Sequence, residues 1–207
     1  MLSLERNLNC SETIRVSIFK IIMSFYDQIF SFYPIIERFI MPSKRRLIDC
    51  VSAKGEVSIL DIGMGQAKWW NSFPKMKFSG IDTSIKMVNY TKKIYPNAIV
   101  HEGSAEQLPF QDQTFDLVVM AHVLSVIDNP KKAFCEAKRV TKDDGEIIII
   151  NHDSKNWKWI DIPLSWFSRL VGVKLPFYLE DIIPNNTKII SSNSIGVFKY
   201  FTFLRLK

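Results

Sequence analysis

Two aspartates around a short glycine-rich stretch are the residues whose spacing could do chemistry. Asp61 is followed by Gly63 and Gly65, and Asp82 lies 21 residues after Asp61. Glycine is needed where a ligand must approach bare backbone, because any side chain would block that approach. A carboxylate at the end of the next strand can accept hydrogen bonds from a ribose diol. The spacing therefore predicts a nucleotide-like ligand between this turn and Asp82.

Alternating strands and helices must position these residues. Continuous apolar runs predict strands over residues 57–62, 78–82, 98–101, 115–120 and 146–150. Capping and breaking residues predict helices over residues 84–95 and from Asn129-Pro130 to Asp143-Asp144-Gly145. Strands that are apolar on both faces indicate a parallel sheet covered on both sides. Residues 187–207 can supply two last strands.

Two helices are predicted before the first strand. Isoleucine and phenylalanine recur at helical spacing between Ile14 and Ile29, and residues 35–53 form a second helical segment that ends at Lys54-Gly55. We therefore expect two parts, an N-terminal helical extension over residues 1–56 that caps a substrate or membrane site, and a ligand-binding domain over residues 57–207.

The glycine spacing separates two classes of cofactor. In the dinucleotide fingerprint a third glycine would stand where this chain has Lys68, so NAD and FAD are disfavoured. The pattern from Asp61 to Ala67 instead resembles class I S-adenosylmethionine (SAM)-dependent methyltransferases, as do residues 103–116 and 139–146 in their order and spacing. The resemblance implies a Rossmann-like α/β fold, a seven-stranded mostly parallel sheet with helices on both faces, with SAM as the cofactor.

The resemblance also implies which residues hold the cofactor. Asp82 is expected to bind the ribose, and Ala105 and Glu106 to flank the adenine. Three departures from the family pattern, at Met64, Ala67 and Ser104, leave room for altered cofactor use. The full set of expected contacts is Asp61, Gly63, Gly65, Asp82, Thr83, Met87, Ser104, Ala105, Glu106 and Ala121.

The finer similarity is to quinone methyltransferases and soluble bacterial phospholipid N-methyltransferases. Residues 123–130 and the pair Asn151-His152 look most like the phospholipid enzymes. Tyr26, His122 and Asn151 are the candidate catalytic residues: the Tyr26 ring could close over the methyl group, His122 could act as a base or orient the acceptor, and Asn151 could meet a polar headgroup. Packed aromatic, packed histidine and loop-ordering roles stay open for them.

Charge and aromatic residues gather in the flanks. The net charge is +6, of which residues 155–207 carry +5. Tryptophans and basic residues interleave over residues 155–185, which favours either contact with an anionic membrane surface or a lid over the active site. The run Lys44-Arg45-Arg46 is interpreted as a solvated helix start.

Composition excludes several function classes. Three scattered cysteines support neither a disulfide framework nor a metal site, and we expect a cytoplasmic protein without a signal peptide. A peripheral location at a membrane is the alternative. Residues 120–123 lack the motif of base-amine methyltransferases, so no nucleic-acid partner is expected. The favoured acceptor is lipophilic, with a phospholipid amine first. A quinone or other small molecule, or cofactor binding without turnover, is the alternative, and the oligomeric state stays open.

Overall fold

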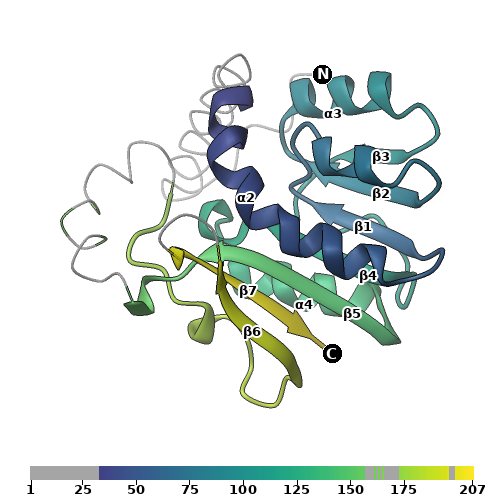
Figure 1. Cartoon of the computed structure of the whole chain (residues 1–207). Helices are drawn as coiled ribbons and strands as arrows, with labels where there is room; N and C mark the ends of the chain where they lie inside the picture. Colours follow the sequence, from purple (N-terminus) through teal and green to yellow (C-terminus); the bar gives the residue numbers. More distant parts are fainter. Residues whose placement is uncertain (1–32, 157–160, 162, 164, 166–172, 196–198) are drawn as a thin grey trace, which may run out of the picture.

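A seven-stranded sheet forms the centre of the computed structural model, which describes residues 33–156, 161, 163, 165, 173–195 and 199–207 (Figure 1). The strand order is β3-β2-β1-β4-β5-β7-β6. Strands β1 to β5 pair in parallel, and β7 is antiparallel to both β5 and β6. The predicted fold class is confirmed. The strands are β1 Ser58–Ile62, β2 Lys77–Asp82, β3 Ile99–Glu102, β4 Phe115–Ala121, β5 Thr141–His152, β6 Ile189–Ile195 and β7 Phe201–Leu206.

Helices cover both faces of this sheet. Helix α2 crosses in front of it, whereas α4 lies behind it (Figure 1). The predicted caps are present: Ser84 Oγ accepts from the amide of Met87, and the Asn129 side chain accepts from the amide of Lys132. No helix of the described residues is long and apolar enough to cross a membrane. The helices are α2 Tyr33–Ser52, α3 Ile85–Ile94 and α4 Pro130–Val140, with short 3-10 helices η1 Lys68–Ser72, η2 Leu124–Val126, η3 Ser154–Asn156 and η4 Leu179–Asp181.

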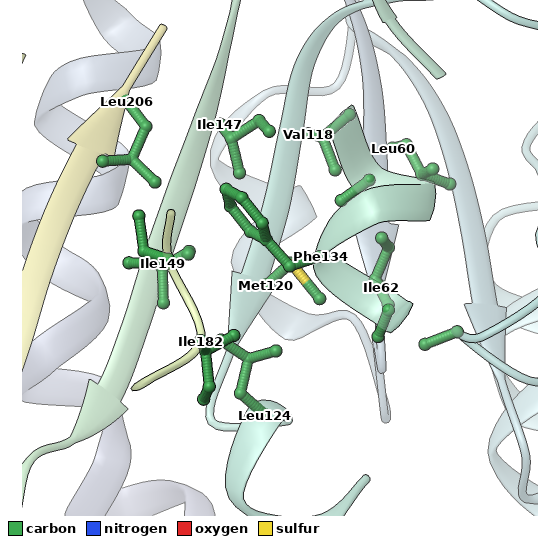
Figure 2. Close-up of a cluster of buried hydrophobic side chains, with 14 of the residues drawn as sticks. Leu60, Ile62, Val118, Met120, Leu124, Phe134, Ile147, Ile149, Ile182 and Leu206 are labelled. Carbon is green, nitrogen blue, oxygen red and sulfur yellow. The ribbon is translucent and has the colours of Figure 1, made fainter. Parts of the chain in front are cut away.

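Two hydrophobic clusters hold the layers together. Successive side chains of a strand point to opposite faces, so Ile148 joins the α2 side, whereas Ile147 and Ile149 join the α4 side. The Phe134 ring of α4 lies among the β-strand side chains of the α4 side, which include Ile147 and Ile149 (Figure 2). Because both faces are buried, the central strands are mostly apolar on both faces, for example over Ile147 to Ile150 of β5.

The fifth strand begins earlier than the sequence predicts. Helix α4 ends at Val140, and β5 starts at Thr141, before the turn residues that were expected to end the helix. Thr141 pairs with Phe115, and the register then shifts before Leu117 pairs with Glu146. Gly145 makes this irregularity possible, because a Cβ there would lie 2.8 Å from the Thr141 methyl group.

Part of the predicted lid segment over residues 155–185 lies in the core. Phe177 and Leu179 are buried in the α4-side cluster. Two of its basic residues are engaged: Lys155 pairs with Glu180, and the Lys174 ammonium donates to the carbonyls of residues 127 and 128. The remaining aromatic and basic residues that predict this segment lie outside the described residues. They are Trp157, Lys158, Trp159, Trp166, Phe167 and Arg169.

Candidate active site

The glycine-rich loop lies where the strand order reverses. Strand β1 pairs with β2 on one side and with β4 on the other, and ligands of open α/β sheets bind at the carboxyl ends of such strands. Gly63 after β1 meets Val123 after β4 so closely that a Cβ on Gly63 would lie 2.4 Å from Val123 Cγ2. Gly63 and Gly65 both have positive φ, 69° and 56°. The geometry explains why glycine stands at both positions.

The amide groups of this loop are already used. The amides of Gly63 and Met64 both donate to the carbonyl of Ile81, and the amide of Gly65 donates to Asp82 Oδ2 at 2.9 Å. A pyrophosphate needs free N–H donors from such a loop. These three amides cannot supply them without breaking a bond, whereas a ligand that carries positive charge does not need them. SAM, with its ammonium and sulfonium groups, fits this donor set better than NAD does.

The loop is followed by the five-residue 3-10 helix η1. Its two indoles, Trp69 and Trp70, are buried, and both donate to the same oxygen of Asp61, at 2.7 and 2.9 Å. Asp61 therefore orders the chain after the loop. Its carboxylate faces the indoles, which is a structural role beside the cofactor contact that the sequence predicts.

Asp61 is a buried acid beside a buried base. Burial raises the pKa of the Asp61 carboxyl to about 6, and nearby Lys44 opposes part of this rise. Lys44 is only 4% exposed, so its interpretation as part of a solvated helix start is wrong. It lies in the middle of α2 and shares a helix face with the core residues Leu47 and Val51. That three- and four-residue spacing is the signal that could have identified it.

Asp82 connects the loop to the start of α3. Its second oxygen accepts from the amide of Ser84 at 2.9 Å, and the residue is half-buried. An ionised carboxylate accepts hydrogen bonds on both of its oxygens, which is the chemistry that binds the diol of a ribose. Two neighbouring candidates follow Asp82 along the chain: Thr83 is half-buried, and Met87 is 3% exposed.

The residues expected around the adenine lie at the ends of β3 and β4. Ala105 and Ala121 are buried, with 7% and 8% exposure. Ser104 Oγ accepts from the amide of Glu106 at 3.1 Å. The Glu106 carboxylate itself accepts from the amide of Asn129 at 2.8 Å, so it also stabilises the start of α4.

His122 follows β4 in a strained conformation. Its φ is 60°, uncommon for a residue with a side chain, and its amide donates to the carbonyl of Ile150 at 2.6 Å. Its Nε2 lies 2.8 Å from Ser43 Oγ on α2. Burial, with smaller effects of Lys44 and His152, lowers the pKa of His122 to about 3. The imidazole is thus neutral and a weak proton acceptor, which favours an orienting role over that of a base.

Asn151 and His152 form the end of β5. Asn151 is fully buried and its Nδ2 donates to the carbonyl of His152 at 3.1 Å. His152 Nε2 lies 3.1 Å from the carbonyl of Lys174, which can only accept, so this nitrogen carries the proton. The pair orders the chain at residue 174, and the third catalytic candidate, Tyr26, lies outside the described residues.

The sequence interpretation missed four polar residues that lie beside His122 and His152. Helix α2 brings Ser43 and Lys44 to the site, while Asp161 and Tyr200 form a hydrogen bond of 2.9 Å beyond β5. Asp161 and Tyr200 lie in segments read only as aromatic and strand-like. No local pattern joins residues 39 positions apart, so only the fold could show this pair.

Replacing Gly63 with alanine tests the close approach of the loop to β4. We expect a loss of roughly 1–3 kcal/mol in the free energy of unfolding, because the new Cβ must displace Val123 and the φ of 69° disfavours a side chain. Gly55→Ala is the control, since a Cβ there meets nothing within 4 Å. Chemical unfolding of both variants would contradict this account if Gly63→Ala were as stable as Gly55→Ala.

Comparison with known proteins agrees with this geometry. Residues 60–149 match a methyltransferase domain family. A phosphatidylethanolamine N-methyltransferase of Cereibacter sphaeroides is 27% identical over 178 residues, 79% of this chain and 86% of that enzyme. The ubiquinone/menaquinone biosynthesis C-methyltransferase UbiE of Campylobacter jejuni is 27% identical over 68% of this chain, which spans only 59% of that enzyme.

Solved structures show the same fold. A SAM-dependent methyltransferase of Thermotoga maritima, described as a possible histamine N-methyltransferase, has a TM-score of 0.68 at 20% identity and covers 91% of this chain and 98% of its own. The YcgJ protein of Bacillus subtilis has a TM-score of 0.63 at 23% identity, and the match covers 72% of this chain and 70% of YcgJ. The domain match over residues 60–149, the loop chemistry and this fold support a class I SAM-dependent methyltransferase, similar to the quinone and phosphatidylethanolamine methyltransferases.

Proposed function

We propose that the methyl acceptor is the amine of a phospholipid such as phosphatidylethanolamine. The observation that carries the proposal is the side-chain oxygen of Asn151, which is buried at the end of β5 and has no hydrogen-bond partner among the described residues. An unpaired buried acceptor is costly, so it favours a ligand with an N–H donor. An ammonium or amine supplies that donor, whereas a quinone carbonyl does not.

The hydrogen bonds around Asn151 fix which of its amide atoms is the oxygen. Its Nδ2 faces the carbonyl of His152, an acceptor, and the unprotonated Nδ1 of the His152 ring at 3.5 Å. A flipped amide would bring two acceptors together at both places. The unpartnered atom is therefore the side-chain carbonyl oxygen, so the site offers a hydrogen-bond acceptor to the substrate.

The chemistry of the donor sets what the protein must do. Bound SAM supplies a methyl group on a sulfonium, a good leaving group, so positioning and exclusion of water are the main tasks of the chain. A phenol or an acidic carbon would also need a base. His122, with its pKa lowered to about 3, is a poor one. This supports an amine acceptor.

The cofactor contacts proposed here follow the sequence expectation. Asp82 binds the ribose diol, and the loop around Gly63 and Gly65 holds the amino-acid end of SAM, with Asp61 acting through the two indoles. The remaining contacts are Thr83, Met87, Ser104, Ala105, Glu106 and Ala121.

We also propose that the flanks deliver the lipid. Residues 1–56 cap the acceptor side, with Tyr26 closing over the methyl group, and the basic aromatic segment over residues 155–185 contacts an anionic membrane surface at which the protein is peripheral. The excess of positive charge in residues 155–207 supports this arrangement.

Label transfer to vesicles tests the acceptor. Purified protein and methyl-labelled SAM are mixed with phosphatidylglycerol vesicles that contain phosphatidylethanolamine, and we expect label in the amine lipid. Vesicles with phosphatidylcholine instead, whose nitrogen has no hydrogen to replace, should stay unlabelled. SAM binding with no label in phosphatidylethanolamine would overturn the proposal.

A matched pair of variants tests the role of Asn151. Asn151→Leu should lower kcat/KM for phosphatidylethanolamine by roughly tenfold or more, because the substrate loses a buried hydrogen bond. Asn193→Leu removes a second buried amide oxygen that has no partner among the described residues, on the edge strand β6, and should leave kcat/KM unchanged. Equal effects of the two substitutions would speak against substrate contact.

A quinone C-methyltransferase is the second candidate. The match to UbiE of Campylobacter jejuni over 149 residues favours it. This candidate predicts that the label is found on a ring carbon of a demethylated quinone when that quinone is added to the vesicles.

A further inference from the structure

A buried carboxylate near the end of β5, on the side of the sheet where we place the methyl acceptor, takes part in no function described so far. Asp161 is fully buried, and both of its oxygens accept hydrogen bonds, one from the hydroxyl of Ser154 and one from the phenol of Tyr200 at 2.9 Å. The Ser154 oxygen in turn accepts from the amide of Phe177 at 2.8 Å, which directs the Ser154 hydrogen towards Asp161. The donors are arranged for an ionised carboxylate, which can only accept.

The charge of Asp161 has no partner of opposite sign in the part of the chain that the structure describes. No lysine or arginine there forms an ion pair with it. Buried charges in proteins are normally paired, because removing an ion from water is costly. The ammonium of an amine acceptor would be attracted to this buried negative charge.

Tyr200 connects this carboxylate to the acceptor side of the sheet. The phenol is half-buried, and its ring stacks on that of His152, with ring centroids 5.8 Å apart and planes 12° apart. The rings of Tyr200 and Phe201 pack edge to face. The Phe201 ring in turn packs edge to face with that of His122, with ring centroids 4.6 Å apart. The phenol therefore belongs to one aromatic group with the residues that follow β4 and β5, and aromatic faces attract cations.

We propose that Tyr200 and Asp161 form a relay that takes the proton from the ammonium group of the methyl acceptor. This inference rests on the proposed function. The N–H bond of the ammonium breaks as an O–H bond forms on the Tyr200 oxygen. At the same time the original Tyr200 proton moves to Asp161. The result is a neutral amine with a free lone pair, a neutral phenol and a protonated carboxyl group, so charge and protons balance.

The electrostatics of the group are consistent with this relay. Burial and the carboxylate of Asp161 raise the pKa of Tyr200 above its usual value, so the phenol keeps its own proton until Asp161 accepts it. Burial lowers the pKa of His152, whose ring stays neutral and holds Tyr200 by stacking. Asp153, with a raised pKa, and His122 are further titratable groups near His152.

Tyr200→Phe tests the relay because it keeps the ring and removes the hydroxyl. At pH 7 we expect kcat for an amine lipid to fall by roughly 100-fold or more, with a small change in KM, as for loss of a general base. Without the relay only amine that is already neutral can react. The rate of the variant should therefore rise nearly tenfold per pH unit towards the amine pKa, about 10 as for lysine, while that of the unmodified enzyme rises less. Tyr178→Phe, at another half-buried phenol, is the control.

A binding measurement separates the relay from the proposed function. Calorimetry with dihexanoyl phosphatidylethanolamine, and with the amine-free phosphatidylglycerol of equal chain length, measures recognition of the amine without turnover. We expect Asp161→Asn to bind the amine lipid at least tenfold more weakly than the unmodified protein while it binds SAM equally well. Should Asp161→Asn fail to fold, Ser154→Ala, which removes one donor to the carboxylate, provides the weaker version of this measurement.

The outcomes are distinct. If the unmodified enzyme binds and methylates the amine lipid and Tyr200→Phe does so equally well, the relay is wrong but the proposed function stands. Absence of both binding and methylation of the amine lipid in the unmodified enzyme would overturn the proposed function, and the relay with it. A loss in Tyr200→Phe that is the same at every pH would also overturn the relay, because it would show a structural role only.

Discussion

Replacing Asp82 with alanine is expected to weaken SAM binding by roughly 100-fold or more. Each charge-assisted hydrogen bond from a ribose hydroxyl to a carboxylate is worth about 1.5–3 kcal/mol, and the proposed diol contact contains two. The substitution also releases the amide of Gly65, which Asp82 holds at 2.9 Å, and that of Ser84 at the start of α3. Loss of the loop conformation adds to the loss of the ribose contact.

Calorimetric titration with SAM measures this effect directly. Asp82→Asn keeps the shape and one acceptor oxygen, so its affinity should fall between those of the alanine variant and the unmodified protein. Asp49→Ala, at an exposed aspartate of α2, should bind SAM normally. Normal affinity in Asp82→Ala would show that Asp82 does not bind the cofactor.

Asp61 is expected to make the protein less stable as the pH rises from about 4 to about 6. Its pKa is raised from 3.8 to about 6 by burial, so the folded state binds the proton more tightly than the unfolded state does. Stability from this group is therefore fully present below the unfolded pKa and is lost as the pH rises through the folded pKa. The shift corresponds to about 3 kcal/mol.

The difference between the unmodified protein and Asp61→Asn isolates this contribution. Asparagine can keep an oxygen towards the two indoles that share Asp61 Oδ2, but it does not titrate. The lowered pKa of His122 acts in the opposite direction over the same range, so the two proteins must be compared at each pH. Chemical unfolding from pH 4 to 8 should show a difference that changes by up to about 3 kcal/mol. A difference independent of pH would contradict the raised pKa.

Local signals predicted most of the fold. The apolar runs that became β1 and β4 and the caps at Ser84 and Asn129 depend on neighbouring residues only, so the sequence alone could reveal them. The start of β5 could not be predicted, because Thr141 is extended through its pairing with Phe115, which is distant in sequence.

Part of the candidate site could be predicted from the sequence, namely the positions at which the backbone conformation requires glycine. Gly63 and Gly65 are glycines because of positive φ and the approach of Val123, and the sequence preserves that requirement. The partners of Asp61 were not predictable, because the indole positions depend on how the chain turns after the loop. Lys44 has the composition of a surface residue, and only its helix face reveals its burial.

A competition experiment tests the central claim most directly. Vesicles that contain phosphatidylethanolamine and a demethylated menaquinone in equal amounts are incubated with the enzyme and methyl-labelled SAM, and mass spectrometry identifies the labelled atom. The account predicts label on the nitrogen of the amine lipid, with strong reduction in Asp82→Ala. Label on the quinone carbon, with none on nitrogen, would contradict it.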